Sequence, residues 1–265
     1  MPDKRIALVV PCYNESQRLD QNAFTAFCAK YPSFYMVFVN DGSRDDTLSR
    51  INAIASVLPG QAFVLHLPVN GGKAEAVRQG FLWALGRDFD MVGYWDADMA
   101  TPLEEAPAMA HTLEHENKEI ILGTRLKILG HHIQRSKLRH VLGRVAATLA
   151  SLTLDFPVYD TQCGAKIFKN TPALKEVFAQ PFTTRWIFDI EVLARFIVFK
   201  NRPPEHGSLL NTCIEHPLKR WEDKKGSKIN SGSYICAFFD LLKIIKLLRK
   251  YRTTRLCKRT RGRNR

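Results

Sequence analysis

The feature that most constrains this chain is a series of short, largely apolar segments that alternate with stretches of helical spacing over the first 125 residues. We expect buried strands at residues 5–10, 35–40, 62–67, 91–95 and 119–123. Between them apolar residues recur every three or four positions, as at Ile51, Ile54 and Leu58. Strands that alternate with helices predict an α/β fold, with a mostly parallel sheet covered by helices on both faces.

Polar residues follow each predicted strand at its carboxyl end. They form five short loops, at residues 11–15, 41–43, 70–73, 96–98 and 124–125. Ligands of open α/β sheets bind beyond the carboxyl ends of the strands. Five such loops at one edge of a sheet therefore predict a binding site there.

The fourth loop carries Asp96 and Asp98, two carboxylates separated by one residue after a buried strand. Oxygen ligands of this kind suit Mg2+ or Mn2+ that bridges a diphosphate. The alternative is a solvated acidic turn. The other polar loops favour the metal site.

Two other acidic residues have two interpretations each. Asp41 either caps a turn with Gly42 or accepts a hydrogen bond from a base or ribose. Glu15 either favours the start of the following helix or binds a nucleotide. The loop at residues 70–73 lacks the glycine spacing and the Ser or Thr of a phosphate-binding Walker loop, and no GxGxxG is present. An ATPase or a dinucleotide enzyme is therefore disfavoured.

The composition, 45% hydrophobic and 25% charged residues, is typical of a folded globular protein. The six cysteines lie far apart without a CxxC pair, so neither a zinc site nor a disulfide framework is expected. The first apolar run is too short for a signal or spanning segment. These features predict a cytosolic catalytic domain.

The positive charge is concentrated at the C-terminus. Residues 243–265 hold 11 basic side chains and no acid, which leaves about +2 of the net +13 for the rest. Residues 234–251 predict an amphipathic helix, with Asp240, Lys243 and Lys250 on a polar stripe, lying on an anionic membrane surface. An Arg-rich tail would also suit RNA. The apolar face favours lipid, so no nucleic-acid partner is expected.

Nine motifs along the chain resemble family 2 glycosyltransferases. They are VVPCYNES, VNDGSRDDT, NGGKAEAVRQG, DADMAT, GTR, RSKLR, DTQCGAKIF, RWIFDIEVL and GSK, between residues 5 and 230. The likeness is strongest to dolichyl-phosphate glucosyltransferases and their bacterial polyprenyl-phosphate relatives. It implies a GT-A fold, a divalent metal, and inverting transfer of a hexose from a UDP-sugar or GDP-sugar to a polyprenyl phosphate at the cytoplasmic face of a membrane.

The same resemblance implies roles for individual residues. The nucleotide pocket would comprise Pro11, Tyr13, Glu15, Asp41, Lys73 and Asp96, and the metal ligands would be Asp96 and Asp98. The acceptor phosphate would meet Arg135, Ser136, Arg139 and Lys228, and the catalytic candidates are Asp98, Arg125, Asp160 and Asp189. A guanidinium fork suits a phosphate, although a solvated basic surface is the alternative. Related mannosyltransferases usually carry Gln where Ala100 stands, which favours glucose and UDP-glucose.

Two carboxylates, Asp160 and Asp189, compete for one catalytic role. A hydroxyl acceptor, on a sugar or a protein, needs a general base, whereas a phosphomonoester with a second pKa of about 6 is already an oxyanion at neutral pH. With a lipid phosphate the carboxylate would only orient groups. We expect a catalytic domain at residues 1–230, in which residues 126–158 face the acceptor or membrane, followed by a basic helix and tail at 231–265. Nothing in the sequence predicts an oligomeric state.

Overall fold

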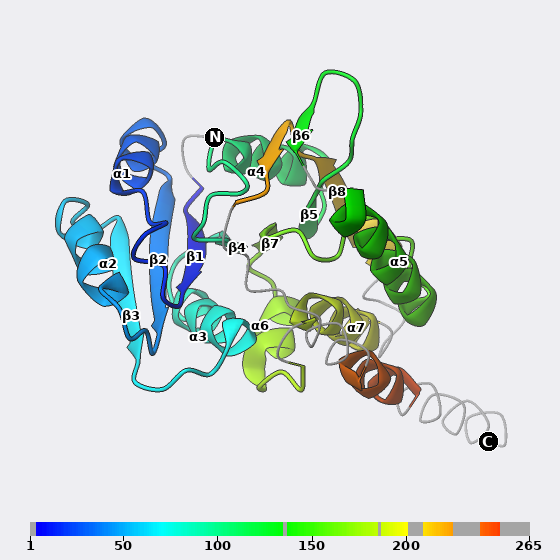
Figure 1. Cartoon of the computed structure of the whole chain (residues 1–265). Coiled ribbons are helices and arrows are strands. Elements are labelled where there is room, and N and C mark those ends of the chain that lie inside the picture. The colour runs from blue at the N-terminus through cyan, green and yellow to red at the C-terminus, as the bar shows by residue number, and fades with distance from the viewer. Residues whose placement is uncertain (1–3, 135–136, 185–186, 201–208, 225–238, 250–265) are drawn as a thin grey trace, which may run out of the picture.

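The computed structural model describes residues 4–134, 137–184, 187–200, 209–224 and 239–249, without the side chains at 137–140, 142 and 200. Its centre is a seven-stranded sheet (Figure 1). In spatial order the strands are β3 (Ala62–Leu67), β2 (Phe34–Asp41), β1 (Ile6–Cys12), β4 (Met91–Trp95), β7 (Ala165–Lys169), β5 (Ile120–Thr124) and β8 (Cys213–Pro217). The five strands predicted from the sequence are confirmed.

One strand reverses the direction of an otherwise parallel sheet. β7 pairs antiparallel with β4 on one side and β5 on the other, whereas β1 with β2 and β4, β2 with β3, and β5 with β8 are parallel. Neither β7 nor β8 was predicted. Lys166 interrupts the apolar pattern of β7, and Glu215 and His216 interrupt that of β8.

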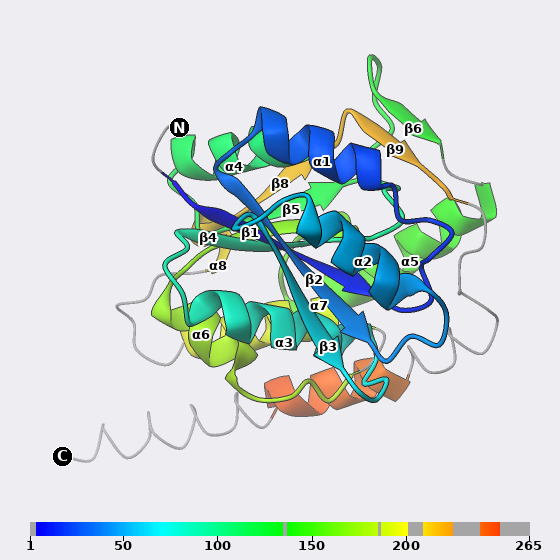
Figure 2. The ribbon, with the colours of Figure 1, turned by 90° about the vertical axis from the view of Figure 1, so that its left-hand side faces the viewer.

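Helices cover both faces of the sheet, as predicted. They are α1 (Gln21–Lys30), α2 (Thr47–Ser56), α3 (Lys73–Leu85), α4 (Glu105–His115), α5 (Lys137–Leu154), α6 (Pro172–Ala179), α7 (Phe188–Lys200) and the short α8 (Leu209–Thr212). In Figure 2, α1 and α4 lie above the sheet and α3 and α6 below it. Two apolar clusters fill these layers, and neighbours on β1 alternate between them: Val9 faces α3, while Leu8 and Val10 face α1. Strands β1, β4 and β5 are continuously apolar because both of their faces are covered and neither meets water.

The C-terminal helix differs from its prediction. Residues 239–249 are helical, but Asp240, Ile244 and Leu248, four residues apart, are buried, and the two apolar ones belong to the core cluster that contains α3 and α7. The side of this helix that was expected to meet a membrane is therefore partly committed to the protein core, and Asp240 is not on a solvent-facing stripe. Residues 234–238 and 250–265 lie outside the described part.

A second, two-stranded sheet joins β6 (His132–Gln134) to β9 (Arg220–Glu222) in parallel. It lies beside α5, on the side of the molecule that carries β5 and β8 (Figure 1). Among the residues described, no helix combines the length and the apolar character that crossing a membrane requires.

Candidate active site

The loops that follow β1 and β2 are joined by hydrogen bonds. The backbone N–H of Asn14 donates to Ser43 Oγ at 3.1 Å, and the N–H of Arg44 donates to Asn14 Oδ1 at 2.8 Å. The N–H of Glu15 donates to Thr47 Oγ1 at 2.8 Å. The first two predicted polar loops therefore form one unit at the sheet edge, with Pro11 and Tyr13 half-buried within it.

Asp41 fixes the third loop. Its buried carboxylate accepts from the N–H of Gly71 at 2.7 Å and from that of Gly72 at 2.9 Å, and its carbonyl accepts from Asn70 Nδ2 at 3.1 Å. Both carboxylate oxygens thus hold the turn that starts α3. This loop-holding role is one that the sequence analysis did not consider.

Glu15 forms an ion pair with Arg18. Its carboxylate contacts Arg18 through two guanidinium nitrogens, with Nε at 2.6 Å from Oε2 and Nη2 at 2.7 Å from Oε1. The positive charge of Arg18 lowers the pKa of Asp98, although burial and the Asp96 carboxylate raise it by more. Glu15 therefore orients a cation toward the carboxylate pair.

Asp96, Asp98 and Lys73 lie together beyond the end of β4. Lys73 Nζ, in the first turn of α3, is 2.5 Å from Asp96 Oδ1. Burial lowers the pKa of this amine, but the carboxylates of Asp96, Asp189 and Asp98 outweigh burial and raise it. Burial and the neighbouring Asp96 raise the pKa of Asp98. Protonation of Asp98 is thus eased first by burial and then by the charge of Asp96, which Lys73 and Arg18 only partly offset.

This charge imbalance fits a divalent cation. Asp96 and Asp98 provide hard oxygen ligands, and a metal ion would supply the positive charge that Asp98 lacks. In the described part of the chain, no group of three or more His, Cys, Asp and Glu side chains could hold a metal ion. The remaining ligands would therefore come from a diphosphate and water, as is usual for Mg2+ at phosphate sites.

A glycine of the DTQCG motif makes room for Asp96. A Cβ atom on Gly164 would lie 1.9 Å from Asp96 Oδ2 and 2.2 Å from its Cγ. The Gly164 carbonyl also accepts from the N–H of Asp96 at 3.0 Å. The motif thus positions Asp96 from the loop just before β7, about 70 residues further along the chain.

Arg125 and Asp160 form a buried, two-point ion pair. Nε and Nη2 of Arg125 lie 2.6 and 2.7 Å from the carboxylate oxygens, and its backbone N–H also donates to Asp160. Burial raises the pKa of Asp160, but the Arg125 guanidinium more than offsets this and lowers it to about 2. The guanidinium also lies 5.2 Å from the ring centre of Trp221. Arg125 is therefore largely neutralised by Asp160.

Asp189 belongs to a second buried pair. Lys166 Nζ lies 2.8 Å from Asp189 Oδ1 and also donates to Tyr94 Oη at 2.9 Å and to the Cys163 carbonyl at 2.6 Å. The Tyr94 hydroxyl donates to Asp189. Burial, with the Asp189 carboxylate, raises the pKa of Tyr94 well above its usual value. Asp189 is therefore part of a closed network of buried polar groups with Lys166 and Tyr94.

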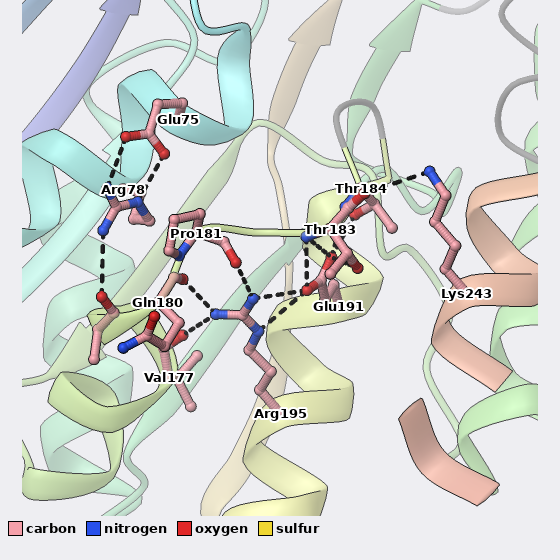
Figure 3. Close-up of polar contacts among 11 residues, drawn as sticks. Glu75, Arg78, Val177, Gln180, Pro181, Thr183, Thr184, Glu191, Arg195 and Lys243 are labelled. Atoms are coloured by element: carbon pink, nitrogen blue, oxygen red, sulfur yellow. Dashed lines mark hydrogen bonds and ion pairs between the residues drawn. The ribbon is translucent and has the colours of Figure 1, made fainter. Parts of the chain in front are cut away.

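A polar frame supports the chain just before Asp189 (Figure 3). The buried Glu191 carboxylate accepts from the N–H groups of Thr183 at 3.0 Å and Thr184 at 2.9 Å, and from Arg195 Nη2 at 2.8 Å. Lys243 donates to the Thr183 carbonyl at 3.4 Å, which links the C-terminal helix to this frame. Arg195 completes the frame by donating to the carbonyls of Val177, Gln180 and Pro181.

The predicted acceptor residues are only partly located. Arg135, Ser136 and Lys228 lie outside the described residues, and Arg139 lies in α5 without a described side chain. Their roles stay predictions.

Several residues at the site were missed from the sequence. Tyr94, Gly164, Lys166, Trp221 and Glu215 contact or position the candidates, and Glu215 accepts from the N–H groups of Tyr159 and Asp160. The available signal was a charged residue between apolar neighbours, at Lys166.

Comparisons with known proteins identify the family of this chain. The model of the family described as "Glycosyl transferase family 2" matches residues 7–177. A dolichyl-phosphate beta-glucosyltransferase of Trichomonas vaginalis is 31% identical over 90% of this chain and 72% of its own length. A polyprenol monophosphomannose synthase of Mycolicibacterium smegmatis is 24% identical over 88% of this chain and 84% of its own.

A solved structure shows the same fold. Glucosyl-3-phosphoglycerate synthase from Mycobacterium tuberculosis, in complex with Mn2+ and UDP-glucose, aligns with a TM-score of 0.65 and 17% identity over 92% of this chain and 80% of that one. The fold and the carboxylate pair at the strand ends define a GT-A glycosyltransferase. The chain belongs to glycosyl transferase family 2.

Proposed function

We propose that this protein transfers glucose, with inversion, from UDP-glucose to a polyprenyl phosphate at the cytoplasmic face of a membrane. The relatives support the class of acceptor, because one is named for dolichyl phosphate and another for polyprenol monophosphomannose. Dolichyl-phosphate beta-glucosyltransferases of several organisms are similar to this chain, which supports the sugar.

One feature of the site supports a phosphate, and not a hydroxyl, as the acceptor group. Both carboxylates that could serve as a general base are committed to buried cations, Asp160 to Arg125 and Asp189 to Lys166. With a pKa of about 2, Asp160 is a weak base. An acceptor hydroxyl needs a strong one, whereas a phosphate monoester is mostly ionised at neutral pH, with a second pKa of about 6. The site therefore suits a nucleophile that is already an anion.

We infer how the donor binds from the excess negative charge at Asp96 and Asp98. These two residues would hold Mg2+ or Mn2+, which when bound would neutralise charge on the diphosphate. Lys73 lies beside Asp96 and can meet a phosphate oxygen when the donor arrives. In the reaction an acceptor phosphate oxygen bonds to the anomeric carbon, while the bond from that carbon to the UDP oxygen breaks and UDP leaves with the electron pair.

The test is an assay of the purified protein with Mn2+, short-chain polyprenyl phosphate and radiolabelled sugar donors. UDP-glucose is compared with UDP-galactose, UDP-GlcNAc and GDP-mannose, and the extracted lipid product is counted. We expect label in the lipid phase from UDP-glucose alone. A higher rate with GDP-mannose would overturn the sugar assignment.

The free polyprenol serves as the matched acceptor. It has the same chain but a hydroxyl in place of the phosphate, so it should accept no sugar. Efficient transfer to the alcohol would refute the lipid-phosphate function. With the phosphate, the rate should rise with pH near 6, as the acceptor ionises, and then level off.

A further inference from the structure

Helix α5 (Lys137–Leu154) has apolar residues on two opposite sides. Ala147, Ala150 and Leu154 are buried against the protein. Four others face solvent, Val141, Val145, Leu149 and Leu152, with exposed fractions of 58, 54, 47 and 75%. Their spacing of four, four and three residues places them in one row along the helix. We call these four residues the α5 row.

The chain around the α5 row is basic. Between residues 126 and 154 the sequence contains five Lys and Arg residues and neither Asp nor Glu: Lys127, Arg135, Lys137, Arg139 and Arg144. An exposed apolar row within a segment that has only positive charge fits a partner that is apolar and anionic at once.

The α5 row is connected to the candidate active site. Arg144, on the same helix, donates through Nη1 to the Tyr159 carbonyl at 2.6 Å, and its guanidinium lies 3.6 Å from the centre of the Tyr159 ring. The next residue is Asp160, the partner of Arg125. Figure 2 shows α5 on the side of the molecule toward which β1 and β2 point, where the donor loops lie.

A hollow of about 430 Å³ lies beside the C-terminal half of the row. Arg144, Ser151 and Asp155 contribute polar groups to its wall, and Leu152, Phe156 and Val158 contribute apolar ones. A wall of this mixed character, next to exposed apolar side chains, suits amphiphilic molecules.

We propose that the α5 row is the surface through which this protein docks on an anionic lipid bilayer. Its apolar side chains enter the boundary between head groups and acyl chains, and the net positive charge of residues 126–154 attracts the segment to anionic head groups. A second copy of the chain fits less well, because it would bring an equally basic, acid-free segment to the same place. The inference deepens the proposed function, since it states how the site would reach a lipid acceptor.

The described C-terminal helix is less suited to this task. Its residues Ile244 and Leu248 are in the core, and of its large apolar side chains Phe239 and Leu242 are the ones most exposed. The α5 row has four exposed apolar side chains, and none of them is needed by the core.

The test is flotation of the full-length protein with vesicles of phosphatidylcholine, with and without phosphatidylserine. The variant Val145→Glu/Leu149→Glu places two negative charges in the α5 row. The matched control is Val57→Glu, at the end of α2 on the opposite side of the molecule, where the side chain is 52% exposed against 54% for Val145. Partition of the double variant should fall on the order of tenfold or more, and the control should bind as the wild type does.

Two further measurements keep the result interpretable. Val145→Ser/Leu149→Ser removes apolar surface without adding charge and should lose part of the binding, so the proposal does not depend on the charged variant folding. The rise of Tm with UDP and Mn2+ should match wild type in every variant. Vesicle binding that is equal for wild type and both double variants, or lost equally in Val57→Glu, would overturn the proposal. If the row is required for flotation but no sugar reaches a lipid phosphate, the surface stands and the proposed function fails.

Discussion

The proposed donor side of the site, with Asp96 and Asp98, and the proposed acceptor side, with Asp160 and Asp189, neutralise their carboxylates differently. On the donor side, Asp96 and Asp98 share Lys73, and the side chains of the Lys73–Asp96 pair are 38 and 32% exposed. On the acceptor side, each acid has its own cation. The exposed fractions there are 11 and 9% for Arg125 and Asp160, and 2 and 5% for Lys166 and Asp189.

This difference implies that one side contributes mainly to ligand binding and the other also to the stability of the fold. The donor side keeps an excess of negative charge that a metal ion and a substrate can balance, so its free energy changes on binding. The acceptor side is balanced before any substrate arrives, and a buried pair loses much stability when one partner is removed. Changes on the donor side should therefore reduce activity more than stability, and changes on the acceptor side should cost stability as well.

The largest effect is expected from Asp98→Asn. The change removes a hard anionic ligand from the pair that would hold the metal ion, so kcat should fall on the order of a thousandfold, while Tm stays near the wild-type value. Turnover and Mn2+-dependent UDP binding are measured by product formation and calorimetry. Full activity of this variant in EDTA would exclude the metal role.

A second experiment compares the two lysines directly. Lys166→Met leaves Asp189 buried without its cation and should cost about 3–5 kcal/mol of unfolding free energy. Lys73→Met, at a partly exposed pair, should cost less than about 1 kcal/mol yet weaken UDP binding. Urea unfolding and UDP titration of both variants test this. Equal destabilisation by the two changes would contradict the comparison.

Gly164→Ala sharpens the link between the two sides. The added methyl group overlaps the Asp96 carboxylate, which must turn away, so kcat should fall about a hundredfold with a smaller loss of stability. The control is Gly86→Ala, where the new Cβ meets nothing closer than 3.5 Å. If both variants keep wild-type rates, the position of Asp96 does not depend on Gly164.

The Arg125–Asp160 pair predicts a pH dependence of stability. The pKa of Asp160 is about 2 in the folded protein and about 3.9 when unfolded, so the ionised pair adds about 2 kcal/mol above pH 4 that is lost as the pH falls toward 2. The difference in unfolding free energy between wild type and Asp160→Asn should therefore shrink over that range. Asp88→Asn, at a fully exposed side chain, is the control. A constant difference would show that Asp160 is not held ionised.

The smallest effect is expected at the predicted acceptor arginines. Arg139→Ala removes a guanidinium that would bind the lipid phosphate, so the KM for polyprenyl phosphate should rise about tenfold while the KM for the donor changes little. Arg50→Ala, exposed on α2, should change neither value. A rise in the KM for the donor alone would indicate that Arg139 contacts the donor and not the lipid phosphate.

Much of the donor side could be predicted from the sequence because its signals are local. Each strand is a short apolar run, and each functional loop follows directly, so the placement of Asp41, Lys73, Asp96 and Asp98 at one sheet edge needed only the parallel topology. The partial burial of the C-terminal helix could not be predicted, for a related reason. Its apolar pattern is the same whether it faces lipid or protein, and only the tertiary structure shows that Ile244 and Leu248 pack in the core.

The sequence by itself determined the fold class, the strand ends and the residues available there, because hydrophobic period and turn chemistry act over a few neighbouring residues. Tertiary structure alone decided which charges meet. Arg125 with Asp160, Lys166 with Asp189, and Gly164 beside Asp96 are contacts across 23 to 68 positions. They arise because β7 inserts antiparallel between β4 and β5. The strength of such pairs depends on burial, and burial is a property of the whole folded chain.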